Sequence, residues 1–326
     1  MIPPRAIQAA RRILTGRPWL GPLVALVVVY LLFYAWRPET FARTQNLVNM
    51  ARQTVVVGVA ATGMTLIIIM GGIDLSVGSL VALTTVAIAS ILKSGAGPLS
   101  AMLGGIAVAA ACGLTTGLFI TRLRITPFIV TLGAMSILRG AAKGIAKEQK
   151  IDVDARGLDT LLATLPPERS FLLVPPGVWI LVFVAGLSAA LLHLTRFGRH
   201  IVAIGSSEPT ALLCGIDVRR VKTMVYALGA ALAGIAGVIE FSKLTVGDPT
   251  DSVGLELEVI ASVVIGGGSL SGGQGSILGS LIGAFLMTVI KTGCTYAGLP
   301  NWVQEVITGS IIIVAAALDR LRARRP

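Results

Sequence analysis

The sequence predicts an all-α, polytopic membrane protein of about ten transmembrane helices, folded as one membrane domain over residues 1–326. Of its residues, 54% are hydrophobic and 13% are charged, whereas soluble domains carry roughly 25% charged residues. Apolar runs of helix-spanning length, about 20 residues each, recur along the whole chain. The 38 glycines suit close helix packing and bent helices, and broken or re-entrant segments are expected.

The predicted helices follow one another with short polar turns between them. The first has Trp and Tyr at its ends, which is typical of a membrane interface. Pro98 and Pro127 each open a helix, where proline is tolerated because the first amide hydrogens have no helical partner. The predicted ranges are 19–36, 47–70, 77–92, 98–120, 127–144, 177–194, 221–241, a short segment at 259–267, 276–292 and 302–318.

Basic residues predict the orientation. The N-terminal residues 1–18 hold four arginines and no acid, and the tail at 319–326 holds four more arginines. The loop at 195–222 carries five Arg or Lys residues against two acids. Positive flanks face the cytoplasm, so these three segments are predicted inside and the loop at 146–175 outside. The net charge of +11 therefore reflects topology, because nucleic-acid binding would require a basic face on a folded domain.

A break interrupts the apolar pattern at Gly71–Ser79, which reads GGIDLSVGS. Irregular backbone survives inside a bilayer only where it is buried in protein or lines a water-filled cavity. An ionisable residue there indicates a functional site. We therefore predict a helix break near a translocation path, formed by Gly71, Gly72, Asp74 and Ser76. Asp74 could cap the next helix through backbone N–H groups, or it could face a polar path.

A second glycine-rich break has a similar sequence. When Gly71 is aligned with Gly266, the second break has glycine and serine at positions that correspond to those of the first break. These residues are Gly266, Gly267, Ser269 and Ser271. Broken apolar segments at corresponding places in two halves indicate a transport path and a possible internal repeat. The alternative is two unrelated breaks in a glycine-rich chain, and the relative orientation of the halves stays open.

The loop that follows Gly205 is predicted to form a short capped helix. Ser207 suits the N-cap, Glu208 favours the positive end of the helix dipole, and Gly215 suits the position after the C-cap. We expect its apolar side chains to point outward toward a partner groove or toward lipid headgroups; they are Ala211, Leu212 and Leu213.

Polar side chains also line the predicted second helix. Asn46, Asn49 and Gln53 could contact a polar solute, and Thr54, Thr62 and Thr65 continue along the helix. The alternative is that these groups join helices by hydrogen bonds. The charged residues in or near predicted spans are expected to pair or to reach the interface; they are Arg52, Arg139, Glu240, Lys291 and Glu305. The three cysteines are scattered, so the sequence predicts no metal site, cofactor or catalytic group.

Four motifs in order resemble the permease subunit of bacterial ABC importers for sugars, in the ribose-type branch. They are the first break, Thr126–Gly133 with Arg139 and Gly140, Ala203–Ile216, and Ile265–Ser276. The resemblance covers about residues 45–320. Ser207 stands where the family usually has Asn, Cys214 where it has Ser, and Gln274 where it has Arg or Lys. The external loop at 141–175 matches poorly.

The resemblance implies a bacterial inner-membrane subunit that pairs with a second permease, alike or different. It further implies a cytoplasmic ATPase, which would receive the coupling helix around Glu208, and a periplasmic sugar-binding protein that docks outside. Residues 270–274 spell LSGGQ, the signature of ABC ATPases, but the sequence lacks the phosphate-binding G-x-x-x-x-G-K-[ST] motif. ATP hydrolysis is thus expected in a partner chain. Alternatives are an importer for another small solute, such as a nucleoside or branched-chain amino acid, and an ion-coupled secondary transporter.

Overall fold

Helices dominate the fold. The computed structural model describes residues 19–41, 43–164 and 172–323, so the predicted cytoplasmic segment at 1–18 and the end of the tail lie outside the described residues. The two short strands β1 (Ile151–Asp152) and β2 (Val246–Gly247) pair antiparallel. The predicted all-α polytopic class is confirmed.

Within the described residues, six helices are long and apolar enough to cross a membrane. They are α4 (Thr44–Ile69), α6 (Pro98–Leu123), α7 (Pro127–Ile145), α8 (Pro176–Leu194), α11 (Val218–Leu244) and α13 (Ile277–Tyr296). Three further apolar helices are α2 (Leu20–Trp36), α5 (Val77–Lys93) and α14 (Asn301–Ala323). The predicted short segment is α12 (Leu255–Ile265), whose 11 residues span about half of the ~30 Å hydrocarbon core.

Several short elements were not predicted. The turn after α2 contains α3 (Pro38–Phe41), and the external loop contains β1 and the 3-10 helix η1 (Leu158–Leu161). The loop predicted at 195–222 holds an unpredicted helix, α9 (Arg196–Ser206), before the predicted short helix, α10 (Glu208–Leu213). Helix α11 begins at Val218 and not at residue 221, because the Asp217 side chain accepts from the amide of Arg220 at 3.1 Å and caps the helix there.

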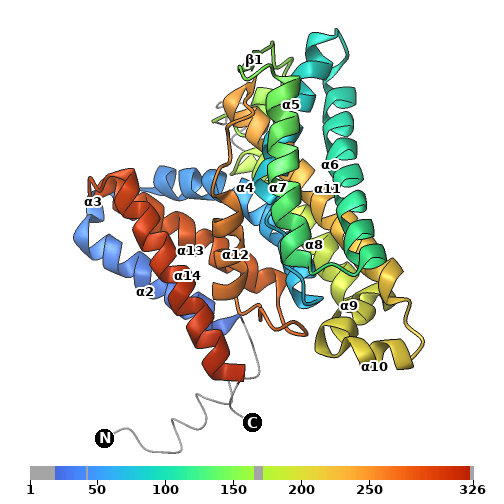
Figure 1. Ribbon diagram of the computed structural model, residues 1–326. Helices are drawn as coiled ribbons and strands as arrows, with labels where there is room; N and C mark the ends of the chain where they lie inside the picture. Colours follow the sequence, from blue (N-terminus) through green and yellow to red (C-terminus); the bar gives the residue numbers. More distant parts are fainter. Residues whose placement is uncertain (1–18, 42, 165–171, 324–326) are drawn as a thin grey trace, which may run out of the picture.

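Figure 1 shows two groups of helices. The taller group holds α5, α6, α7, α8 and α11, and α9 and α10 project from its end opposite β1. The second group holds α2, α12, α13 and α14. Helix α4 packs against members of both groups, including α11 and α13, and most of its residues are buried.

Small residues bring the helices close together. Space for a Cβ is missing at Gly63 in α4, which faces Gly229 of α11, and at Gly113 in α6, which faces Ala230. Hydroxyl pairs join α4 to α13, with Thr54 and Thr288 at 2.9 Å and Thr65 and Ser280 at 2.7 Å. Thr54 and Thr65 thus connect helices, as polar side chains do within membranes, whereas Thr62 donates to the Gly58 carbonyl of its own helix.

Candidate functional site

The first break is a glycine cap at the end of α4. Gly71 has φ +86°, a left-handed conformation that glycine adopts without strain. The amides of Gly71 and Gly72 donate to the carbonyls of Ile68 and Ile67, both at 2.9 Å, which satisfies the last turn of the helix. Gly72 lies against the hydroxyl of Tyr226 in α11, with no room for a side chain.

Asp74 is buried, with 1% of its surface exposed. Its Oδ1 accepts from the Ser76 amide at 2.8 Å and from the Ser76 hydroxyl at 2.6 Å. Ser76, and not Asp74, occupies the N-cap position of α5. The prediction that Asp74 caps α5 is therefore wrong. The Asp74 carboxyl group instead stabilises the turn that precedes the N-cap residue, Ser76.

Replacing Asp74 tests whether this turn is its role. We expect Asp74→Ala to destabilise the protein by about 1–3 kcal/mol, because buried donors lose their acceptor. Asp74→Asn keeps a carbonyl oxygen in place and is expected to retain most of the stability. Thermal unfolding of the purified proteins in detergent measures the difference. If both variants keep wild-type stability but lose transport equally, the carboxyl group acts in the path instead.

The second break repeats the glycine cap at the end of α12. Gly267 has φ +91°, and the amides of Gly267 and Gly268 donate to the carbonyls of Val264 and Val263 at 3.0 and 2.8 Å. The capping glycine that corresponds to Gly71 is thus Gly267. The structure shifts the predicted alignment at this point by one residue.

The side-chain turns still follow the predicted alignment. Ser269 Oγ accepts from the Ser271 amide at 3.4 Å, as Asp74 accepts from the Ser76 amide in the first break. The second break is therefore one residue shorter between its glycine cap and its side-chain turn. The two breaks share a local design, which is the structural basis for regarding them as related.

The two breaks meet each other and the end of α9. We call the contact of Gly71, Gly205, Gly272 and Gly273 the glycine junction. The Gly273 amide donates to the carbonyl of Ile69 at 2.8 Å. A Cβ on Gly205 would overlap the Ile69 carbonyl and lie 2.6 Å from the Gly273 nitrogen, and one on Gly272 would lie 2.7 Å from the Gly205 carbonyl. Three backbone segments therefore touch here without intervening side chains.

Helix α10 follows this junction directly. Ser207 caps it by accepting from the Thr210 amide at 3.4 Å, and Gly215 ends it with φ +78°, so the predicted capped helix is confirmed. The predicted exposure of Ala211 is wrong: it is 3% exposed and packs inward. Leu212 and Leu213 do face outward, with exposures of 56% and 89%.

An ion pair holds α10 against the start of α11, with Glu208 Oε2 2.6 Å from Lys222 Nζ. Glu208→Arg is expected to displace α10, because two cations would then face each other. We expect it to reduce recovery of the partner ATPase in a pull-down of the tagged permease. The charge-swapped double variant Glu208→Arg/Lys222→Glu should restore recovery, whereas undiminished recovery with the single variant contradicts the expectation.

The three residues predicted to contact a solute are separated by the fold. Asn46 is buried and accepts from the Tyr296 hydroxyl at 3.2 Å, so its amide joins α4 to α13. Asn49 is half-buried. Gln53 is exposed, and of the three only Gln53 is among the residues that line a charged cavity.

This charged cavity has a volume of about 380 Å³. Its walls come from α4, α11, α12, α13 and the segment between α11 and α12. Sequence reasoning missed most of the lining because the contributing residues are far apart in the chain. They are Arg52, Gln53, Val56, Val57, Glu240, Lys243, Asp251, Ser252, Val253, Leu255, Glu258, Thr288 and Lys291.

The segment at 245–254 is held in place from outside the cavity. Arg139 of α7 donates to the carbonyls of Pro249 and Asp251 at 3.0 and 2.6 Å. Asp248 pairs with Lys150 at 3.0 Å. Burial raises the pKa of Asp248, but hydrogen bonds from Thr250 and Lys150 outweigh it and leave the pKa below its ordinary value.

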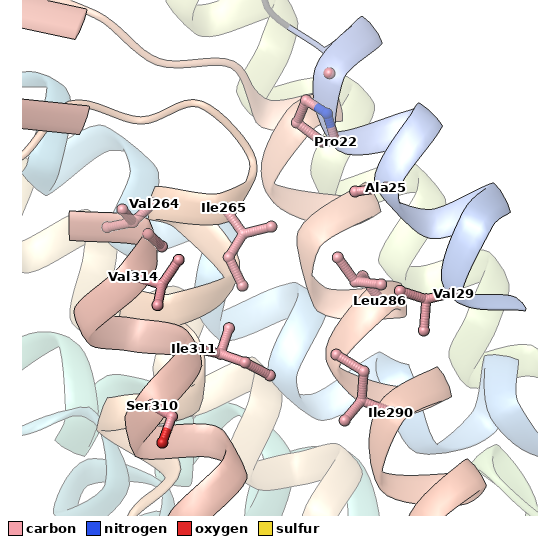
Figure 2. Close-up of a pocket in the computed structure, with 12 residues that line it drawn as sticks. Pro22, Ala25, Val29, Val264, Ile265, Leu286, Ile290, Ser310, Ile311 and Val314 are labelled. Carbon is pink, nitrogen blue, oxygen red and sulfur yellow. The ribbon is translucent and has the colours of Figure 1, made fainter. Parts of the chain in front are cut away.

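A larger, apolar pocket of about 500 Å³ lies between α2 and α14 and is lined also by α12 and α13. Figure 2 shows aliphatic side chains such as Leu286, Ile290 and Ile311 around it, with Ser310 as the polar exception. None of the residues predicted for the site lines it. Its chemistry suits lipid chains, and it offers few partners to a polar solute.

Comparisons with known proteins agree on one family. A family model described as the branched-chain amino acid transport system / permease component matches residues 46–316. The ribose import permease protein of Bacillus subtilis (strain 168) is 38% identical over 307 residues, covering 93% of each chain. That of Escherichia coli (strain K12) is 37% identical over 314 residues, covering 95% of this chain and 97% of the relative.

More distant relatives carry similar names. The L-arabinose ABC transporter permease protein of Azospirillum brasilense is 32% identical over 324 residues, covering 98% of this chain and 94% of the relative. No solved structure matches. The chain therefore belongs to this family of ABC transporter permeases and is a multi-pass protein of the inner membrane.

Proposed function

We propose that the chain is the permease subunit of an ATP-driven importer and forms the membrane path for a monosaccharide, ribose-like or another simple sugar. The observation that carries this proposal is helix α10, which presents Leu212 and Leu213 to the outside on the predicted cytoplasmic side. Such apolar residues on a short projecting helix need a partner groove. The ribose and arabinose permeases among the relatives support a sugar as the solute.

The partners follow from this function. A cytoplasmic ATPase subunit receives α10, a second permease completes the membrane unit, and a periplasmic binding protein delivers the sugar. The segment that spells LSGGQ belongs to the second break, where Gly272 and Gly273 approach the α9 backbone too closely for side chains. Its glycines serve this packing, and the nucleotide chemistry falls to the partner ATPase.

Reconstitution tests the proposal. Proteoliposomes that hold the chain, its ATPase and its binding protein should accumulate labelled ribose only when ATP is supplied on the ATPase side. The matched control is the chain alone, which should show no uptake under a proton or sodium gradient. Gradient-driven uptake by the chain alone would contradict an ATP-driven importer and favour a secondary transporter.

A branched-chain amino acid is the second candidate solute, because the matching family model carries that description. Uptake of labelled ribose and labelled leucine by the same proteoliposomes separates the two candidates. We expect uptake of ribose and not of leucine.

A further inference from the structure

The charged cavity lies where the membrane helix pattern is incomplete. Helix α12 has 11 residues, and the chain reaches it from α11 through the non-helical residues 248–254. This segment lies beside the loop predicted outside, because Lys150 pairs with Asp248 and strand β1 pairs with β2. Arg139 supplies partners for two carbonyls of this segment, while Asp251, Ser252 and Val253 line the cavity. The cavity therefore lies beside this segment, on the side of the protein predicted to face outward, and polar groups form part of its wall.

The charges in the cavity balance. Arg52, Lys243 and Lys291 oppose Glu240, Asp251 and Glu258 among the lining residues. Two pairs are closed: Lys243 lies 2.8 Å from Glu240, and Lys291 contacts Glu258. A cavity without net charge favours a neutral solute, because an ionic solute would gain no excess of opposite charge there.

Arg52 stands apart from these pairs. Within the described residues, Arg52 has no ion-pair partner. Its Nε is buried without a hydrogen-bond partner. One guanidinium nitrogen donates to the Thr164 hydroxyl at 3.4 Å. Beside it, Gln53 is exposed and accepts only a long bond of 3.5 Å from Thr292. A guanidinium and an amide offer the donors and acceptors that sugar hydroxyls need.

We propose that this charged cavity is a transient binding site for a neutral sugar on its way through the permease, with Arg52 and Gln53 as its contacts. The inference rests on the proposed function and adds the residues that meet the solute. A volume of about 380 Å³ falls within the usual range of small-molecule sites, about 300–1,000 Å³. Because four of the six charges are already paired with each other, binding is weak, and a transport path requires a site that the solute can leave.

Protection of a single cysteine tests the site without the ATPase or the binding protein. The probe is Val253→Cys, at an exposed position that lines the cavity, in a chain whose three native cysteines are replaced. We expect D-ribose at about four times its Kd to slow labelling by a small thiol reagent about fivefold, following the factor 1 + [L]/Kd. The matched probe Ser94→Cys is exposed at the end of α5, outside the cavity, and should label at the same rate with and without ribose.

Arg52→Leu in the probe chain should abolish the protection. The control Arg122→Leu, which changes an exposed arginine outside the cavity, should retain it, and unchanged thermal unfolding in detergent shows that the variants are folded. If ribose gives no protection, or if Arg52→Leu leaves it intact, while the reconstituted importer accumulates ribose, this inference is overturned and the proposed function stands. Protection by leucine alone, together with absent ribose uptake, overturns the proposed function itself.

Discussion

Gly205→Val is expected to abolish ATP-driven sugar uptake while leaving the permease assembled with its ATPase. The glycine junction has no space for a Cβ at Gly205, since it would overlap the Ile69 carbonyl and approach the Gly273 amide. Overpacking of a well-packed contact costs about 1–3 kcal/mol or more. The side chain therefore forces α9 away from both breaks, whereas the leucine surface of α10 stays available.

The physical reason for so large an effect lies in what the junction connects. Helix α9 leads directly into α10, and its last residues contact the ends of both broken helices. If the ATPase moves α10, as proposed, the movement should reach the two breaks through these backbone contacts, because packed interiors are poorly compressible. Separating these backbones should uncouple ATP hydrolysis from the membrane helices.

Three measurements on Gly205→Val separate uncoupling from misfolding. The tagged permease should still recover the ATPase, and basal ATP hydrolysis should persist. Uptake of labelled sugar should fall more than about tenfold, because a cost of about 1.4 kcal/mol changes an equilibrium tenfold. Gly186→Val in α8 is the matched control, because a Cβ there meets no atom within 4 Å. Wild-type uptake by Gly205→Val would refute a role of the junction in transmission.

Leu213→Asp is expected to release the ATPase from the permease. Leu213 is 89% exposed on α10, and burial of a leucine in a partner groove contributes about 1.5–3 kcal/mol. The substitution removes this contribution and also buries a charge, so we expect the association to weaken at least about tenfold. Titration of the detergent-solubilised permease with purified ATPase measures the change in Kd.

A second exposed leucine provides the control for this titration. Leu173 is 77% exposed in the predicted external loop, so Leu173→Asp should bind the ATPase as the wild type does. Equal weakening by Leu173→Asp and Leu213→Asp would indicate a general loss of stability. Unchanged affinity of Leu213→Asp would remove α10 as the ATPase contact.

Sequence patterns predicted the features that depend on neighbouring residues. Apolar runs predict the long helices, although not α3 or α9. Glycines within apolar sequence predict the breaks, and in the structure Gly71 and Gly267 take left-handed conformations that other residues rarely adopt. The capped helix α10 was predicted from Ser207 and Gly215, whose capping roles depend only on residues a few positions away. The family resemblance rested on the same local motifs.

Tertiary packing decided what the sequence left open. Asn46 accepts from the Tyr296 hydroxyl, whereas Gln53 lines the charged cavity, and Ala211 faces inward only because α10 packs on its neighbours. The glycine junction and the charged cavity both assemble residues that are distant in the chain. Periodicity and caps are properties of one segment, whereas the contact of Gly205 with two breaks and the place of Arg52 in the cavity wall depend on how separate segments pack. For this reason the sequence alone determined the helices and the family, and the tertiary structure determined the site.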